Sequence, residues 1–185
     1  MDDALFEEIS DLEMTLPAET KAEHFQRLAD DEVAAGPRRV ALLAAAGDHW
    51  QLRGEYDRAR ECFEAMPAAG DDEELPAAAH LLVLALETGD HERASLLDRA
   101  LRRLSTERHL GTTYTFVAES YEEAGRPRDA VRWFSLANAD VDPDELDALD
   151  VVAVIGRARV RGALGLPRDR YDHAATALKG DGPPG

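Results

Sequence analysis

The chain has 185 residues, 44% of them hydrophobic, and a formal net charge of −17 at pH 7. This composition is ordinary for a folded domain with a substantial core and argues against extensive disorder. The negative charge argues against nucleic acid and against an anionic membrane as partners, because both are bound through basic faces. It favours a protein or peptide that is basic, or amphipathic with basic flanks.

The helix-favouring residues Ala, Leu, Glu and Arg dominate, and the alternation typical of strands is scarce. We therefore predict an all-α protein of about ten helices. They are expected over residues 3–14, 18–35, 38–53, 56–66, 75–88, 91–105, 108–124, 127–138, 143–164 and 168–178.

Several residues predict where these helices begin and end. Gly36 is expected to end one helix and Pro37 to begin the next. Asp142 is expected to cap a helix that begins at Pro143, with Glu145 in the capping-box position. Thr106 is the expected cap of the helix that follows it. The C-terminal segment KGDGPPG has nothing apolar to bury and is expected to be disordered.

A glycine recurs at intervals of 35 and 36 residues, and an alanine follows each glycine five residues later. The glycines are Gly54, Gly89 and Gly125, and the alanines are Ala59, Ala94 and Ala130. The period is that of a helical hairpin repeat, in which the glycine closes the turn and small residues let helices approach closely. One hairpin cannot bury both of its faces, whereas stacked hairpins can. We expect Gly47, Ala59, Ala118 and Ala130 to be buried at helix crossings.

These positions resemble the tetratricopeptide repeat (TPR) family. Val40–Pro67 and Gly111–Ala137 match its pattern well, whereas Leu75–Leu104 keeps the alanines and lacks the aromatic residues. The resemblance implies a right-handed stack of helical hairpins, a TPR-like α-solenoid. The segments GRPRDAVRWF and GRARVRGALGLPRDRYD further resemble uncharacterised actinobacterial TPR proteins, some of which carry a cysteine-rich SEC-C motif. That motif is absent from this sequence.

The resulting division has four parts. Residues 1–36 form an N-terminal hairpin or degenerate repeat, and residues 37–140 form three TPR-like units. Residues 141–178 form a C-terminal capping hairpin, because Arg157 and Arg161 fall where a repeat would place large apolar side chains. The disordered tail covers 179–185.

No motif for catalysis or for cofactor binding stands out. The segment Asp140–Val151 has aspartates at the first three ligand positions of a calcium loop but lacks the glycine and the final glutamate, so we interpret it as a solvated linker with a helix cap. Gly70–Pro76 is interpreted in the same way. The six histidines show no metal-binding spacing, and Cys62, the one cysteine, is expected to be a buried thiol. Neither phosphate-binding nor nucleophile motifs are present. We expect no enzyme activity, metal or cofactor.

The N-terminal sequence MDDALFEEIS lacks the features of a signal peptide, and no apolar run approaches the ~20 residues of a membrane span. A cytoplasmic location is therefore expected.

Seven aromatic residues occupy packing positions of the repeat, which favours a role in the protein core over stacking on nucleic-acid bases. Oligomeric state does not follow from the sequence.

The TPR resemblance implies that the first helix of each unit lines a concave groove. The residues at the usual contact positions are Asp48, Gln51, Leu52, Val83, Leu86, Glu87, Glu119, Glu122 and Glu123. This groove is acidic with an apolar middle, which suits a basic peptide or a helix with basic flanks. The expected function is a non-catalytic adaptor or regulatory scaffold. Two alternatives stay open: the acids are merely solvated, or the protein is an enzyme or metal-dependent protein with a site built from scattered His, Asp and Glu.

A secondary candidate site comprises Arg157 and Arg161, which lie four residues apart on one stripe of a helix. Two guanidinium groups so placed could bind phosphate or carboxylate. The alternative is a solvated stripe paired with acids such as Asp150.

Overall fold

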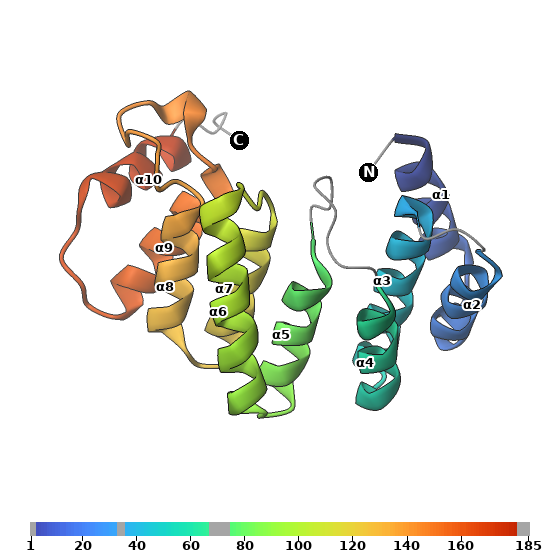
Figure 1. Ribbon diagram of the computed structural model, residues 1–185. Helices are drawn as coiled ribbons and strands as arrows, with labels where there is room; N and C mark the ends of the chain where they lie inside the picture. The colour runs from blue at the N-terminus through green and yellow to red at the C-terminus, as the bar shows by residue number, and fades with distance from the viewer. Residues whose placement is uncertain (1–2, 33–35, 67–74, 181–185) are drawn as a thin grey trace. The chain divides into compact units, whose positions relative to one another are not determined.

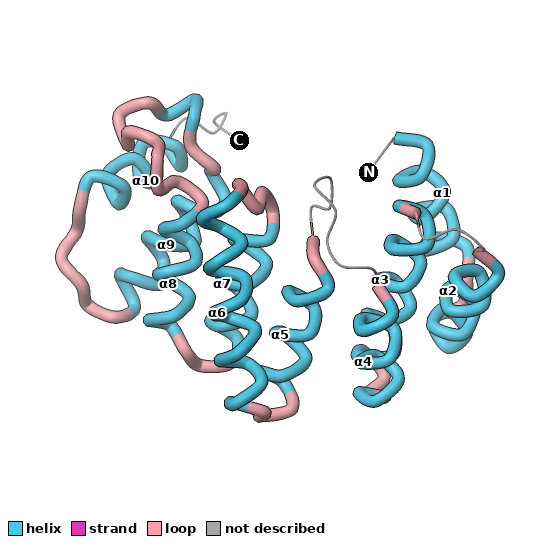
Figure 2. The backbone as a smooth tube through the Cα atoms, in the orientation of Figure 1, coloured by secondary structure: helices cyan, strands magenta, loops and turns pink. Residues whose placement is uncertain are grey.

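The computed structural model describes residues 3–32, 36–66 and 75–180 (Figure 1). Within these ranges the secondary structure is helical and no strand is present, which confirms the all-α prediction (Figure 2). The elements are α1 (Asp3–Thr15), α2 (Ala18–Asp31), α3 (Pro37–Leu52), α4 (Tyr56–Ala65), α5 (Ala77–Glu87), α6 (His91–Glu107), α7 (Thr113–Glu123), α8 (Pro127–Leu136), the 3₁₀ helix η1 (Leu146–Ala148), α9 (Val151–Ala163) and α10 (Arg170–Gly180).

The chain forms two compact units, Met1–Glu107 and Arg108–Gly185. In the first unit α2 packs on α3, α3 on α4, α4 on α5 and α5 on α6; in the second unit α7 packs on α8, α8 on α9 and α9 on α10. Alternate helices also meet, since α3 contacts both α1 and α5, and α7 contacts α9. This neighbour-to-neighbour packing is that of a stack of helical hairpins.

Four hairpins close with the same turn. Its glycine has a φ between 66° and 74°, in the left-handed region that favours glycine. The N–H of the next residue donates to the carbonyl four residues before the glycine, at 2.8–3.0 Å, and the glycine N–H donates to the carbonyl three residues before it. These are the two hydrogen bonds of a Schellman motif. The glycines are Gly54, Gly89, Gly125 and Gly165. The hairpin α9–α10 thus closes like those of the three predicted repeats.

Gly125→Ala is expected to lower the free energy of unfolding by about 1–2 kcal/mol, because alanine is strained at a φ of +69°. Urea denaturation followed by circular dichroism measures this loss. Gly162→Ala is the matched control, since Gly162 lies in α9 with right-handed backbone and open space around an added Cβ. An equal response of the two variants would contradict the role of the turn.

Large aromatic side chains and small residues together form the core. Gly47, Ala59, Ala118 and Ala130 are buried as predicted. An added Cβ at Gly47 would lie 2.3 Å from Cε1 of Phe63, so the ring packs directly on the backbone of α3. Gly156 and Phe134 repeat this arrangement between α9 and α8, at 2.6 Å. Six of the seven predicted core aromatics are buried: Trp50, Phe63, Tyr114, Tyr121, Trp133 and Phe134.

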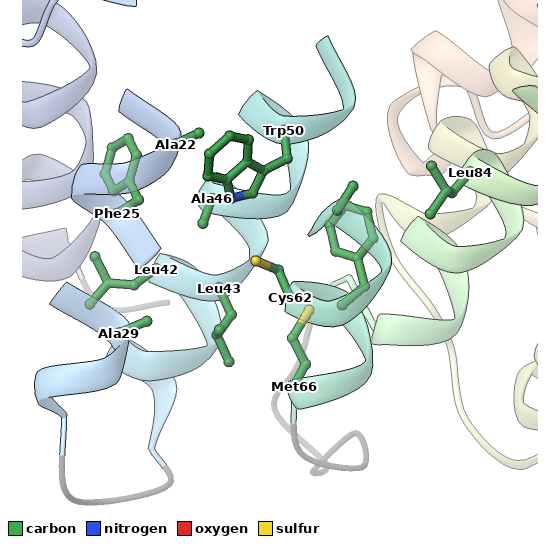
Figure 3. Packing of buried hydrophobic residues seen from close by; sticks show 12 residues of the cluster. Ala22, Phe25, Ala29, Leu42, Leu43, Ala46, Trp50, Cys62, Met66 and Leu84 are labelled. Atoms are coloured by element: carbon green, nitrogen blue, oxygen red, sulfur yellow. The ribbon is translucent and has the colours of Figure 1, made fainter. Parts of the chain in front are cut away.

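In the first unit, the core cluster joins α2, α3, α4 and α5 (Figure 3). Phe25 of α2 and Trp50 of α3 are among its largest members, and Cys62 of α4 lies within it. Cys62 is a free thiol, 3% exposed, as predicted. Burial raises the pKa of this thiol to about 11, and the nearby charges of Asp30 and Glu61 add to the shift. The thiol is therefore protonated at neutral pH and has little nucleophilic character.

The prediction of one helix over 143–164 is wrong. The helix begins at Val151, and Asp150 caps it by accepting a hydrogen bond from the Ala153 N–H at 3.0 Å. Asp142 instead accepts from the Asp144 N–H at 3.0 Å and so closes a turn. The side chain of Asn138 accepts from the Asp150 N–H at 2.7 Å, which holds the chain extended just before the cap.

Two further boundary predictions are wrong. Gly36 has extended backbone and is the N-cap of α3, whereas α2 ends at Asp31; Pro37 does begin α3, as predicted. Thr106 lies inside α6, where its hydroxyl donates to the Arg103 carbonyl at 2.7 Å.

Two predicted irregular segments fall partly or mostly outside the described residues. The first is the acidic linker 70–76, of which the structure describes only residues 75 and 76. The second is the predicted tail 179–185: Lys179 and Gly180 belong to α10, and residues 181–185 are not described.

Candidate functional site

The predicted groove residues lie on α3, α5 and α7. Those on α3 and α5 share the first unit, in which these two helices contact each other. Asp48 and Glu87 are exposed, and so is Leu52, whose relative exposure of 81% is unusual for leucine. Leu86 is only 8% exposed and packs in the core, so it does not contribute a ligand contact. Val83 and Gln51 are half-buried.

The carboxylate of Glu87 is held by two hydrogen bonds from neighbouring helices. The Gln51 Nε2 donates to Glu87 Oε2 at 2.6 Å, and the Tyr56 hydroxyl donates to Glu87 Oε1 at 3.0 Å. The hydrogen bond to Glu87 raises the pKa of Tyr56, and the charge of that carboxylate acts in the same direction. Glu87 is therefore an oriented negative charge beside the end of α3.

The second carboxylate of the first unit, Asp48, lies beside a buried histidine. His80 is 4% exposed and its ring stacks on Phe63 with the centroids 4.7 Å apart. Its Nδ1 is 3.2 Å from the Asp48 Oδ1. Sequence reasoning missed this contact, because it joins residues 32 positions apart on α3 and α5. The carboxylate of Asp48 thus contacts the buried ring of His80 on one side and is exposed to solvent on the other.

In the second unit, the predicted acids lie along α7. Glu119 and Glu123 are exposed. Glu122 is half-buried and forms an ion pair with Arg159 of α9 at 2.5 Å. The contact between α7 and α9 makes this pair the counterpart of the Gln51–Glu87 contact between α3 and α5.

The secondary candidates Arg157 and Arg161 do not form a solvated stripe. Their side chains are only 12% and 15% exposed. Arg157 donates to both carboxylate oxygens of Asp169, at 3.0 and 2.8 Å, and to the Ser135 hydroxyl at 2.9 Å. Arg161 contacts the carboxylates of Asp172 and Asp169, both at 3.1 Å.

These two aspartates also form the beginning of α10. Asp169 accepts from the Asp172 N–H at 3.2 Å, and Asp172 accepts from the Asp169 N–H at 3.0 Å, which is a reciprocal capping box. The hydrogen bond from Arg157 lowers the pKa of Asp169 to about 2. The cluster of Arg157, Arg161, Asp169 and Asp172 therefore links α9 to α10, and its guanidinium groups bind the chain's own carboxylates.

Asp150, the partner suggested by the sequence, is occupied as a helix cap instead. Two carboxylates of the acidic segment before it are also engaged, since Asp142 and Asp144 both accept from Arg170, at 2.9 and 2.8 Å. Across the described ranges, no three His, Cys, Asp or Glu side chains are grouped closely enough to hold a metal ion.

The described part of the chain is thus an all-α stack of helical hairpins. It presents carboxylates in the C-terminal halves of α3 and α5 in the first unit and of α7 in the second unit. Comparison with family models, with curated proteins and with solved structures gave no match. None of the helices in the described part of the chain combines the length and apolar character needed to cross a bilayer.

Proposed function

We propose that the protein is a TPR-type interaction module, a cytoplasmic adaptor or regulatory scaffold without chemistry of its own. It binds a basic peptide or amphipathic helix on the face of the first unit to which α3 and α5 contribute. The observation that carries the proposal is the combination on α3 and α5 of an exposed Leu52 with the carboxylates of Asp48 and Glu87.

The chemistry of this face suits a partner with both apolar and basic side chains. A leucine that is 81% exposed offers apolar area, and neighbouring acids offer contacts to lysine or arginine. The contacts of Glu87 with Gln51 and Tyr56 restrict its carboxylate before binding, so less conformational entropy is lost in the complex. In the second unit, Glu119 and Glu123 of α7 are exposed charges of the same sign. Such charges raise the association rate and orient a basic partner.

The test begins with peptides selected from a phage-displayed random library on the purified chain. The proposal expects the selected peptides to be basic or amphipathic and their binding, measured by fluorescence anisotropy, to weaken with salt. Glu87→Lys and the double variant Glu119→Lys, Glu122→Lys are the groove variants. We expect at least one of them to weaken binding about tenfold or more, which corresponds to ~1.4 kcal/mol.

The control is the double variant Glu61→Lys, Glu64→Lys on α4. It makes the same change of charge as the double variant on α7. It also removes one ion pair, as that variant does: Glu64 pairs with Arg93 at 2.5 Å, and Glu122 pairs with Arg159 at the same distance. Circular dichroism verifies that all variants are folded. If both groove variants bind the selected peptides as well as the control does, the proposal is wrong.

A further inference from the structure

The C-terminal helices carry positive charge on a strongly negative protein. Residues 157–180 contain six basic and two acidic side chains, whereas the whole chain has a net charge of −17. The cluster of Arg157, Arg161, Asp169 and Asp172 balances two of these basic residues internally. Arg159 pairs with Glu122, and Arg170 pairs with acids of the preceding segment.

The two basic residues that remain are Arg168 and Lys179. In the described part of the chain neither has an ion pair with a carboxylate, and both line one pocket between α9 and α10. The pocket has a volume of about 240 Å³. Its lining is Ala158, Arg159, Gly162, Leu166, Arg168, Asp172, Ala175, Thr176 and Lys179. Small residues keep it open, and an added Cβ at Gly162 would meet no atom within 4 Å.

The guanidinium group of Arg168 is held in one orientation. Its Nη2 donates to the Asp172 carbonyl at 3.0 Å and to the Thr176 hydroxyl at 2.5 Å. That hydroxyl donates in turn to the Asp172 carbonyl at 3.0 Å, so it positions Arg168 and has no proton left for a ligand. The Nε and Nη1 of Arg168 remain as donors, and each can give one hydrogen bond to an oxyanion.

We propose that this pocket binds a phosphate monoester. The two positive charges without a carboxylate partner, on Arg168 and Lys179, match the dianion of such a group near neutral pH. Arg159 lies at the same pocket and keeps donors beyond its contact with Glu122. The carboxylate of Asp172 does not repel the ligand strongly, because Arg157 and Arg161 already neutralise it.

The size of the pocket restricts the rest of the ligand. A volume of 240 Å³ is below the range of pockets for drug-sized molecules, so it suits a phosphate with a few carbon atoms and not a nucleotide. Leu166, which is 41% exposed, and Ala175 offer apolar contact to a short carbon chain. A small phosphorylated metabolite and the phosphorylated side chain of a peptide share this chemistry. The pocket has the opposite charge to the proposed interaction residues, and it meets them at one point, where Arg159 of the pocket pairs with Glu122.

Isothermal titration calorimetry on the full chain tests the inference with four probes. They are inorganic phosphate, O-phosphoserine, a short peptide containing phosphoserine and the same peptide without phosphate. Binding of O-phosphoserine or of the phosphopeptide, with no binding of the unphosphorylated peptide, supports the site. Tighter binding of the phosphopeptide than of O-phosphoserine assigns the ligand to a protein, and equal binding assigns it to a small molecule.

The pocket variant is the double substitution Arg168→Gln, Lys179→Gln, and it should weaken binding more than tenfold. The control, Arg128→Gln with Arg132→Gln, makes the same charge change on α8 away from the pocket, and it should change binding less than twofold. Thr176→Val keeps the charge but removes one of the two hydrogen bonds that orient Arg168, so an intermediate loss is expected. The inference is overturned if no phosphorylated probe binds at millimolar concentration, or if the pocket and control variants lose affinity equally.

Discussion

Replacing Arg157 with alanine is expected to lower the free energy of unfolding by about 3 kcal/mol. The side chain is 12% exposed, and its removal takes one partner from the buried carboxylate of Asp172 and a bidentate partner from the more exposed carboxylate of Asp169. The loss is at the lower end of the range for breaking a buried pair, because Arg161 still contacts both carboxylates. The contact of the guanidinium group with the Tyr171 ring, 5.1 Å from its centroid, disappears as well.

Urea denaturation followed by circular dichroism at neutral pH measures this loss. Arg132→Ala is the control, since Arg132 is 65% exposed and its ion pair with Asp129 spans 3.4 Å. We expect the control to change stability by less than about 0.5 kcal/mol. A loss from Arg157→Ala no larger than that of the control would show that the cluster contributes nothing to stability.

The effect of Arg157→Ala should also depend on pH. The pKa of Asp169 is lowered to about 2 from an ordinary value of 3.8, so the ionised form is favoured in the folded protein. The resulting stabilisation is fully present above pH 3.8 and is lost as the pH falls through about 2. The difference in stability between the parent protein and the variant should therefore shrink between these pH values. A difference that stays constant would contradict the role assigned to Asp169.

The second large effect is expected at the contact between Gly47 and Phe63. Phe63→Ala should cost about 3–5 kcal/mol, because a fully buried ring is lost from the core of the first unit. Gly47→Ala alone should cost about 1–3 kcal/mol, since its Cβ would overlap that ring. In the Phe63→Ala background the same substitution should stabilise by about 0.5–1 kcal/mol, because the space is open and alanine favours helix more than glycine does.

This change of sign is measured by a double-mutant cycle with urea denaturation. Gly162→Ala is again the comparison, because its added Cβ meets no neighbour and its effect should be the same with and without Phe63. If Gly47→Ala is equally destabilising in both backgrounds, the ring is not what excludes a side chain at Gly47.

Local chemistry explains why much of this fold could be predicted from the sequence. A glycine that ends a helix with positive φ acts through its own backbone, so the spacing of Gly54, Gly89 and Gly125 was enough to place three turns. The small residues at helix crossings were equally predictable, because close approach of two helices excludes larger side chains at Gly47 and Ala130. Cys62 was expected to be buried for another reason: it lies within a predicted helix without a companion motif, and a free cysteine packs as a small apolar residue.

Only the tertiary structure decided which charged groups meet. Arg157 and Arg161 looked like surface residues, since a sequence rich in acids offers many partners and the choice among them depends on packing. The turn at Gly165 returns the chain so that Asp169 and Asp172 face α9, and the four charges then compensate one another, with all but Asp169 largely shielded from water. The start of α9 depended likewise on the side chain of Asn138, twelve residues before its cap. The pocket at Arg168 exists because α9 and α10 present small residues to each other, an arrangement that no spacing in either helix reveals.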